Sequence, residues 1–221
     1  MVQQKLPQNI PALTGIRALA ALLVLALHAS QNVPTHIATY LPFINHGYLG
    51  VDFFFILSGF IITHVYLMNF QKIDSEAVRI FFWHRLVRLY PVHLAMLVVM
   101  IAMVLISRAA GRVISADSFN WSDLIWQLTL THAWGFGASA SWNVPSWSIS
   151  AEWFAYLFFP WIALGLHRLN SAAIAYFLSA AALILMAALF ITSGLGIDVW
   201  SGGPALVRVT MEFICGAALC R

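Results

Sequence analysis

The sequence predicts an all-α fold, a polytopic bundle of about six transmembrane helices. Of its 221 residues, 62% are hydrophobic and only 9% are charged, whereas a soluble domain carries about 25% charged residues. Apolar segments of about 20 residues, the length that crosses a bilayer, recur along the chain. The predicted spans cover residues 13–33, 47–68, 89–107, 146–166, 171–193 and 204–220. The net charge of +3 is small and scattered, which favours the lipid bilayer rather than nucleic acid as partner.

The first span, "TGIRALAALLVLALHAS", carries two ionisable residues, Arg17 and His28. Such residues are costly at membrane depth and are usually functional. Eleven helical residues bring His28 to within about 20° of the direction of Arg17, roughly 16 Å further along. We therefore expect both on one face, with Arg17 toward the cytoplasm and His28 in the outer half. The alternative is that Arg17 snorkels to the interface and His28 packs between helices.

The distribution of Lys and Arg predicts a cytoplasmic N-terminus, because short cytoplasmic loops carry an excess of these residues. Six basic residues fall on the predicted inner side of the first three spans, and two fall in the loop that follows the third. They are Lys5, Arg17, Lys72, Arg79, Arg85 and Arg88 inside, and Arg108 and Arg112 outside.

Two carboxylates are expected at the depth of His28. The second span enters from outside as "GYLGVDFFFILSGFIITHVY" and places Asp52 about one turn in, and the fourth enters as "SWNVPSWSISAEWFAYLFFP" with Glu152 about a turn and a half in. A lone buried carboxylate is usually a structural hydrogen-bond partner. Three ionisable residues at one depth favour an acid/base site in the outer half.

The predicted inner layer is cationic. "FFWHRLVRLYP" places Arg85 and Arg88 at i,i+3, on one face of a helix end, and Arg17 is expected at a similar level. Arginine suits bidentate recognition of phosphate. Anchoring of anionic lipid at the membrane surface is the alternative.

The remaining polar residues favour structural roles. Segment 119–134 is too polar for a span, and we expect an interfacial or partly inserted helix whose tryptophans form an aromatic belt or stack on sugars. Arg208 and Glu212 are expected to form a buried i,i+4 ion pair. Cys215 and Cys220 read as core residues, and with no His-Glu-x-x-His motif we expect no metal.

Four motifs in this order resemble the membrane acyltransferase-3 family, of the O-antigen and exopolysaccharide O-acetylase type. They are Arg-x10-His (Arg17 and His28), "GYLGVDFFFILSGFIIT", Arg-x-x-Arg (Arg85 and Arg88) and "PSWSISAEWFAY". The resemblance covers essentially the whole chain. Family members usually have about ten spans, so residues 1–221 are expected to form a single domain that is incomplete at its C-terminus, or an unusually short member.

The resemblance implies an acyltransferase of the bacterial inner membrane that uses cytosolic acyl-CoA, in the form of acetyl-CoA, as donor substrate and holds no bound cofactor. Its usual acceptor is a hydroxyl of a carbohydrate or lipid-linked glycan. Acyl transfer needs a base or a transient acyl carrier, and His28 is the candidate for either role. The carboxylate of Asp52 or Glu152 would hold the tautomer of His28. The residues Arg17, Arg85 and Arg88 would bind the donor.

Three alternatives bear on this interpretation. Ser58 in "LSGF" lacks the Gly-x-Ser-x-Gly context, so a serine acyl-enzyme is not expected. A transporter or flippase-like protein would also line a pathway with intramembrane charges, although no internal repeat supports it. An inactive remnant of a longer protein is the third alternative.

Overall fold

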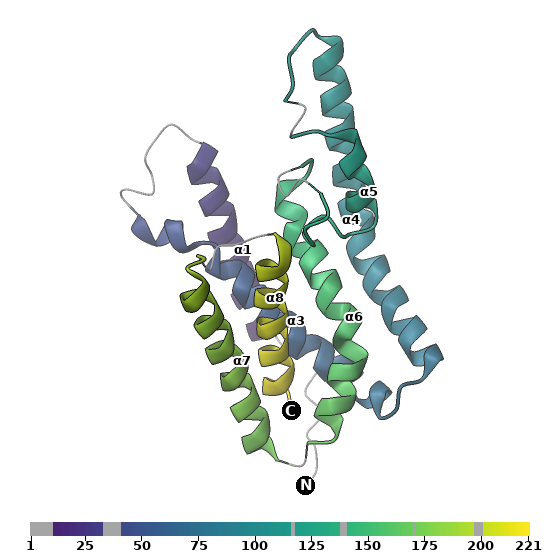
Figure 1. Ribbon diagram of the computed structural model, residues 1–221, viewed down its shortest axis with the longest axis vertical. Helices are drawn as coiled ribbons and strands as arrows, with labels where there is room; N and C mark the ends of the chain where they lie inside the picture. Colours follow the sequence, from purple (N-terminus) through teal and green to yellow (C-terminus); the bar gives the residue numbers. More distant parts are fainter. Residues whose placement is uncertain (1–10, 33–40, 116–117, 138–140, 170, 197–200) are drawn as a thin grey trace. The chain divides into compact units, whose positions relative to one another are not determined.

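The computed structural model describes residues 11–32, 41–115, 118–137, 141–169, 171–196 and 201–221 (Figure 1). These residues contain helices and turns and no strand, and six of the helices are long and apolar enough to cross a membrane. The predicted all-α, multi-pass fold is therefore confirmed. The elements are α1 Pro11–Asn32, η1 Pro42–His46, α3 Leu49–Tyr66, η2 Leu67–Phe70, α4 Ser75–Ala109, η3 Trp121–Asp123, α5 Leu124–Leu128, η4 Val144–Ser146, α6 Trp147–His167, α7 Ala172–Ser193 and α8 Gly202–Leu219.

The chain divides into two compact units, Met1–Phe55 and Ile56–Arg221, which we describe separately. In the first unit, α1 packs against the start of α3 through two glycines. A Cβ at Gly50 would lie 2.7 Å from the carbonyl oxygen of Ala20, and one at Gly47 would lie 2.5 Å from that of Leu23. Only glycine permits this approach, which explains the first two glycines of "GYLGVDFFFILSGF".

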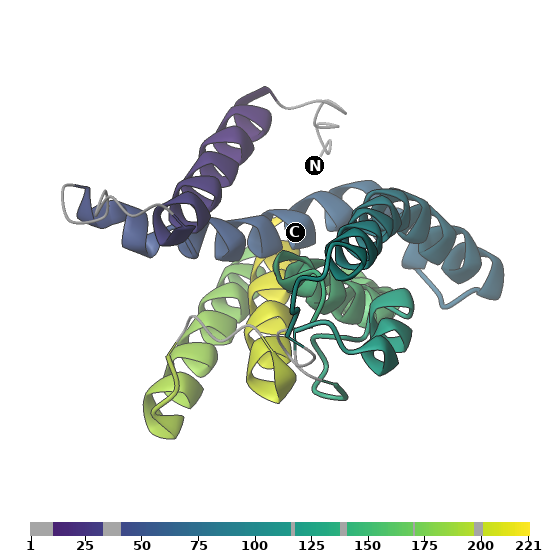
Figure 2. The same cartoon turned by 90° about the horizontal axis from the view of Figure 1, so that it is seen from above.

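The second unit is built around α6, which contacts α4, η2 and α8, while α7 packs along α8 (Figures 1 and 2). The third glycine of the motif belongs here. A Cβ at Gly59 would collide with the carbonyl group of Phe213 on α8, and one at Gly216 would collide with the carbonyl group of Ile56 on α3. Helices α3 and α8 therefore cross with their backbones in contact at this pair of glycines.

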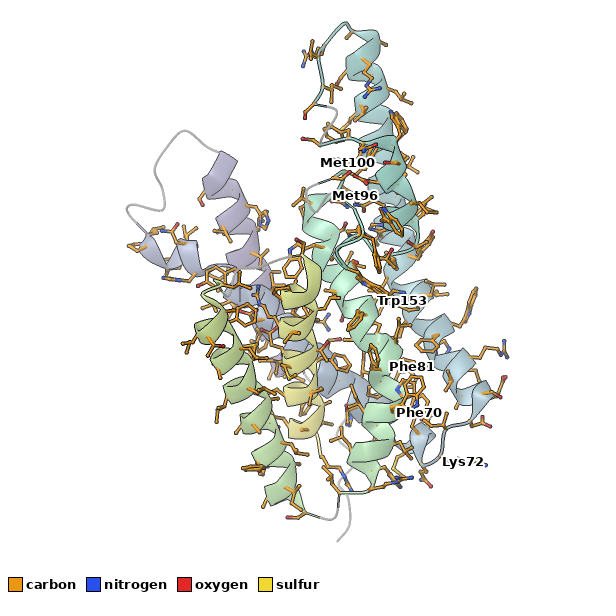
Figure 3. The ribbon with its side chains drawn as sticks, in the orientation of Figure 1. Phe70, Lys72, Phe81, Met96, Met100 and Trp153 are labelled. Carbon is orange, nitrogen blue, oxygen red and sulfur yellow. The ribbon has the colours of Figure 1, made fainter. Side chains whose placement is uncertain are left out.

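Aromatic rings fill the space between α4, α6 and α8. The rings of Phe81 and Phe159 stack at 5.0 Å, and Phe70 meets both edge-on at 5.7 Å. Figure 3 shows Phe70 and Phe81 together where the lower part of α4 passes α6. Phe213 extends the cluster to α8. These four rings are fully buried and form an aromatic core.

Helix α4 begins earlier than the predicted third span, which started at residue 89. The Asp74 side chain accepts a hydrogen bond from the Ala77 N–H at 3.1 Å and caps the helix, which then runs unbroken for 35 residues, about 52 Å. Pro91 lies inside it. The first turns are polar, so hydropathy places the span too late, and Arg85 and Arg88 lie within the helix rather than at its end.

The predicted interfacial helix over 119–134 is wrong in extent. Only η3 and the five-residue α5 form there, and Leu130 adopts a positive φ of 57° that interrupts any continuation. The segment packs on the far half of α4, where Trp142 joins Leu97 and Val104 in a small core. Trp142 is 2% exposed and is part of this core.

Candidate active site

The clearest polar cluster in the second unit surrounds Glu152 on α6. The Ser58 hydroxyl donates to Glu152 Oε1 at 2.5 Å, and the Tyr156 hydroxyl donates to the same oxygen at 2.5 Å. The two hydroxyl oxygens lie 3.1 Å apart. The two donors hold the carboxylate in one fixed orientation. No hydrogen bond to Glu152 Oε2 occurs among the described residues, so that oxygen can take part in proton transfer.

The sequence analysis missed both partners of Glu152. Tyr156 lies four residues after Glu152, on the same face of α6, and this spacing could have signalled the contact. Ser58 comes from α3 and is the neighbour of Gly59, whose close approach to α8 sets the position of the helix. The serine was considered only as a nucleophile, whereas the structure shows it holding a carboxylate.

Arg85 lies in a second cluster, formed by the end of α3 and the first half of α4. Its guanidinium carbon is 5.1 Å from the centroid of the Tyr66 ring and 6.0 Å from that of Phe81. Its Nη2 donates to the Tyr66 hydroxyl at 3.1 Å. Within the described part of the chain, no carboxylate forms an ion pair with Arg85. Its charge is therefore stabilised by aromatic faces rather than neutralised.

The aromatic core between α4, α6 and α8 joins the two clusters. The Phe81 ring lies beneath Arg85 and also meets the Tyr156 ring edge-on at 6.2 Å. Arg85 and Glu152 therefore border the same packed cluster, although prediction placed them in separate layers. Arg88 is solvent-exposed, while Arg85 is half-buried, so the two arginines of the Arg-x-x-Arg motif occupy different environments.

In the first unit, α1 is continuous from Arg17 to His28, so the two residues share a face as predicted. His28 Nδ1 lies 2.8 Å from the carbonyl oxygen of Val24. Because a carbonyl only accepts, Nδ1 carries the proton in this bond. The role predicted for Asp52 or Glu152, holding the tautomer of His28, stays a prediction.

Asp52 lies in the first turn of α3 and belongs to the same unit as His28. The expected orientation of the His28 ring by Asp52 stays a prediction. The approach of Glu152 to His28, and of Arg17 to Arg85 and Arg88, would join the two units and stays a prediction.

A buried polar cluster that the sequence analysis did not identify lies between α4 and residues 127–146. The rings of His93 and His132 stack at 5.6 Å, nearly parallel. His93 Nε2 donates to the carbonyl oxygen of Gln127 at 2.9 Å, and His132 Nε2 lies 3.0 Å from the Ser146 hydroxyl. Burial lowers the pKa of His132 to about 4. This cluster ties the segment to α4.

The predicted ion pair within the last span is confirmed. Arg208 Nε lies 3.5 Å from Glu212 Oε1, and both side chains are buried. The Arg208 guanidinium also lies 5.9 Å from the centroid of the Trp147 ring on α6. Cys215 and Cys220 are free thiols. Among the described residues, no group of three or more His, Cys, Asp or Glu side chains is placed to hold a metal ion.

The sequence profile of the acyltransferase domain matches residues 10–221, and the chain belongs to the acyltransferase-3 family. The family that the motifs indicated is therefore confirmed. No solved structure matches the chain.

Curated relatives include three bacterial proteins. Acyltransferase MdmB of Streptomyces mycarofaciens is 35% identical over 69% of this chain. Peptidoglycan O-acetyltransferase OatA of Listeria monocytogenes is 34% identical over 42% of the chain, and putative peptidoglycan O-acetyltransferase YrhL of Bacillus subtilis is 27% identical over 95%. The aligned regions span 38%, 13% and 33% of these relatives, respectively.

Proposed function

We propose that the protein transfers an acyl group, acetyl in the first instance, from cytosolic acyl-CoA to a hydroxyl of a cell-surface or lipid-linked carbohydrate at the bacterial inner membrane. Family membership supports acyl transfer. Relatives named as peptidoglycan O-acetyltransferases support an acetyl group and a glycan acceptor. The Glu152 cluster carries the proposal, because it fixes a carboxylate inside a membrane-spanning helix bundle.

His28 is the proposed base or acyl carrier, since an imidazole can accept a proton near neutral pH and can carry an acyl group. As a base, Nε2 takes the proton of the acceptor hydroxyl while the oxygen attacks the acyl carbon, the C–S bond breaks, and the coenzyme A thiolate then takes the proton. As a carrier, Nε2 attacks the acyl carbon first, the C–S bond breaks, and coenzyme A leaves as the thiolate. The acceptor hydroxyl oxygen then attacks the acyl carbon, the N–C bond breaks, and the hydroxyl proton passes to the thiolate.

Glu152 is the proposed second acid/base group. Its Oε1 is held by Ser58 and Tyr156, which leaves Oε2 to accept a proton or to stabilise a positive charge that develops during the reaction. A carboxylate with a purely structural role in a bundle would be expected to use both oxygens.

Arg85 is the proposed donor-binding cation, together with Arg17 and Arg88. Its guanidinium is half-buried and has no carboxylate partner in the described residues, so it keeps a full charge for a phosphate of acyl-CoA. The alternative, anchoring of anionic lipid, suits the exposed Arg88 better than it suits Arg85.

The test is acyl transfer by the full chain in lipid vesicles, with radiolabelled acetyl-CoA and a glycan acceptor. His28→Ala and Glu152→Gln should each lower the rate by at least about 100-fold, the loss typical of a positioned acid/base group, and His167→Ala at the end of α6 serves as control. Wild-type rates in His28→Ala would contradict the proposal.

Two further results would favour the alternatives. Movement of unmodified solute without acyl transfer would indicate a transporter. If the chain is inactive beside an active full-length relative, the remnant interpretation is favoured. Mass spectrometry of surface glycans with and without the gene would identify the acceptor.

A further inference from the structure

A hydrogen-bond chain runs from Arg85 through Tyr66 to His84. Arg85 Nη2 donates to the Tyr66 hydroxyl oxygen at 3.1 Å, and that oxygen lies 3.1 Å from His84 Nδ1. Because arginine can only donate, the phenol oxygen accepts from Arg85. The contact with His84 holds the same hydroxyl from its other side.

The aromatic faces around Arg85 complete its surroundings. Phe81 lies one turn before Arg85 on α4, and the Arg85 guanidinium carbon lies 6.0 Å from the centroid of its ring. The Tyr66 ring meets Phe81 edge-on at 5.2 Å, which fixes the ring that carries the hydroxyl. Arg85 Nε is buried and makes no hydrogen bond among the described residues. A phosphate oxygen is an acceptor that would satisfy such a donor.

We infer that Tyr66 is a positioning residue for donor binding, because its hydroxyl and ring hold the Arg85 guanidinium in the orientation that meets an acyl-CoA phosphate. This inference rests on the proposed function of Arg85. Tyr66 acts through Arg85 and contacts no reacting atom. Its removal should therefore weaken donor binding and leave the chemical step unchanged.

Tyr66→Phe isolates the hydroxyl, since the ring face and its packing on Phe81 are retained. The experiment measures KM for acetyl-CoA and kcat for the full chain in vesicles. We expect KM to rise about tenfold, the equivalent of one hydrogen bond to a charged group, with kcat unchanged. Tyr176→Phe is the matched control, because Tyr176 is an exposed tyrosine on α7 and should match the wild type.

A double-mutant cycle distinguishes positioning from a general loss of structure. If Tyr66 acts through Arg85, then Arg85→Ala and Tyr66→Phe/Arg85→Ala should show the same KM. Equal KM values for Tyr66→Phe and the wild type, or additive effects in the double mutant, would overturn the inference while leaving the role of Arg85 intact. An unchanged KM in Arg85→Ala would overturn both the inference and the proposed donor site.

Discussion

Gly216→Ala should destabilise the protein because it separates two helices. Gly216 is the point on α8 where the backbone of α3 passes, and an added methyl would meet the carbonyl group and the Cα of Ile56. A backbone carbonyl cannot rotate away as a side chain can. The helices must move apart, and Ser58, two residues beyond Ile56, moves with α3.

The expected cost follows from two opposing effects. Overpacking in a well-packed core costs about 1–3 kcal/mol, and the collision with backbone favours the upper end of that range. Replacing a helical glycine by alanine returns about 1 kcal/mol through the lower conformational entropy of the unfolded chain. The net loss is about 2 kcal/mol, which corresponds to a fall in Tm of about 4–8 °C for a chain of this size.

The assay is thermal unfolding in detergent, followed by a thiol-reactive dye. In a Cys220→Ser background, Cys215 is the remaining thiol, and it is 2% exposed in the folded chain. Gly165→Ala on α6 is the matched control, because a Cβ there meets no atom within 4 Å. A Tm for Gly216→Ala equal to that of Gly165→Ala would refute the close crossing of α3 and α8.

Three further predictions concern single side chains. Ser58→Ala removes one of the two donors to Glu152 and should lower the rate of acyl transfer about tenfold with KM for acetyl-CoA unchanged; a wild-type rate would show that Tyr156 alone holds the carboxylate. Arg88→Ala should weaken donor binding roughly ten- to a hundredfold, and Arg88→Lys should recover part of that; lost membrane insertion with intact donor affinity would indicate lipid anchoring. Because burial lowers the pKa of His132 from 6.5 to about 4, the unfolded chain takes up the proton first, and stability should fall by up to about 3 kcal/mol between pH 6.5 and pH 4. His132→Asn should reduce this pH dependence of Tm, and an unchanged slope would contradict the assignment.

Hydropathy was sufficient to predict all six spans, since apolar length is what a bilayer requires. It failed where a helix extends beyond its apolar part. The cap at Asp74, rather than hydropathy, decides where α4 begins. The helix predicted over residues 119–134 was wrong for the opposite reason. Its apolar spacing is helical, but the positive φ of Leu130 and tertiary packing on α4 interrupt the helix.

The site residues were predicted as single ionisable side chains, and their partners were not. Glu152 was identified from its depth, whereas its contact with Ser58 joins residues 94 positions apart, which spacing cannot reveal. His28 Nδ1 bonds to the Val24 carbonyl, and a backbone partner leaves no signal in residue type. Tyr66 was overlooked because its partners His84 and Arg85 lie 18 and 19 residues away in the sequence.

Pro91 removes one backbone hydrogen bond from the middle of α4, although the helix continues through it. Lacking an N–H, it leaves the carbonyl of Val87 without its usual helical partner, and a gap in the hydrogen-bond ladder is where a long helix bends most easily. Pro91 thus separates the turns that carry Arg85 and Arg88 from the turn in which His93 bonds to Gln127.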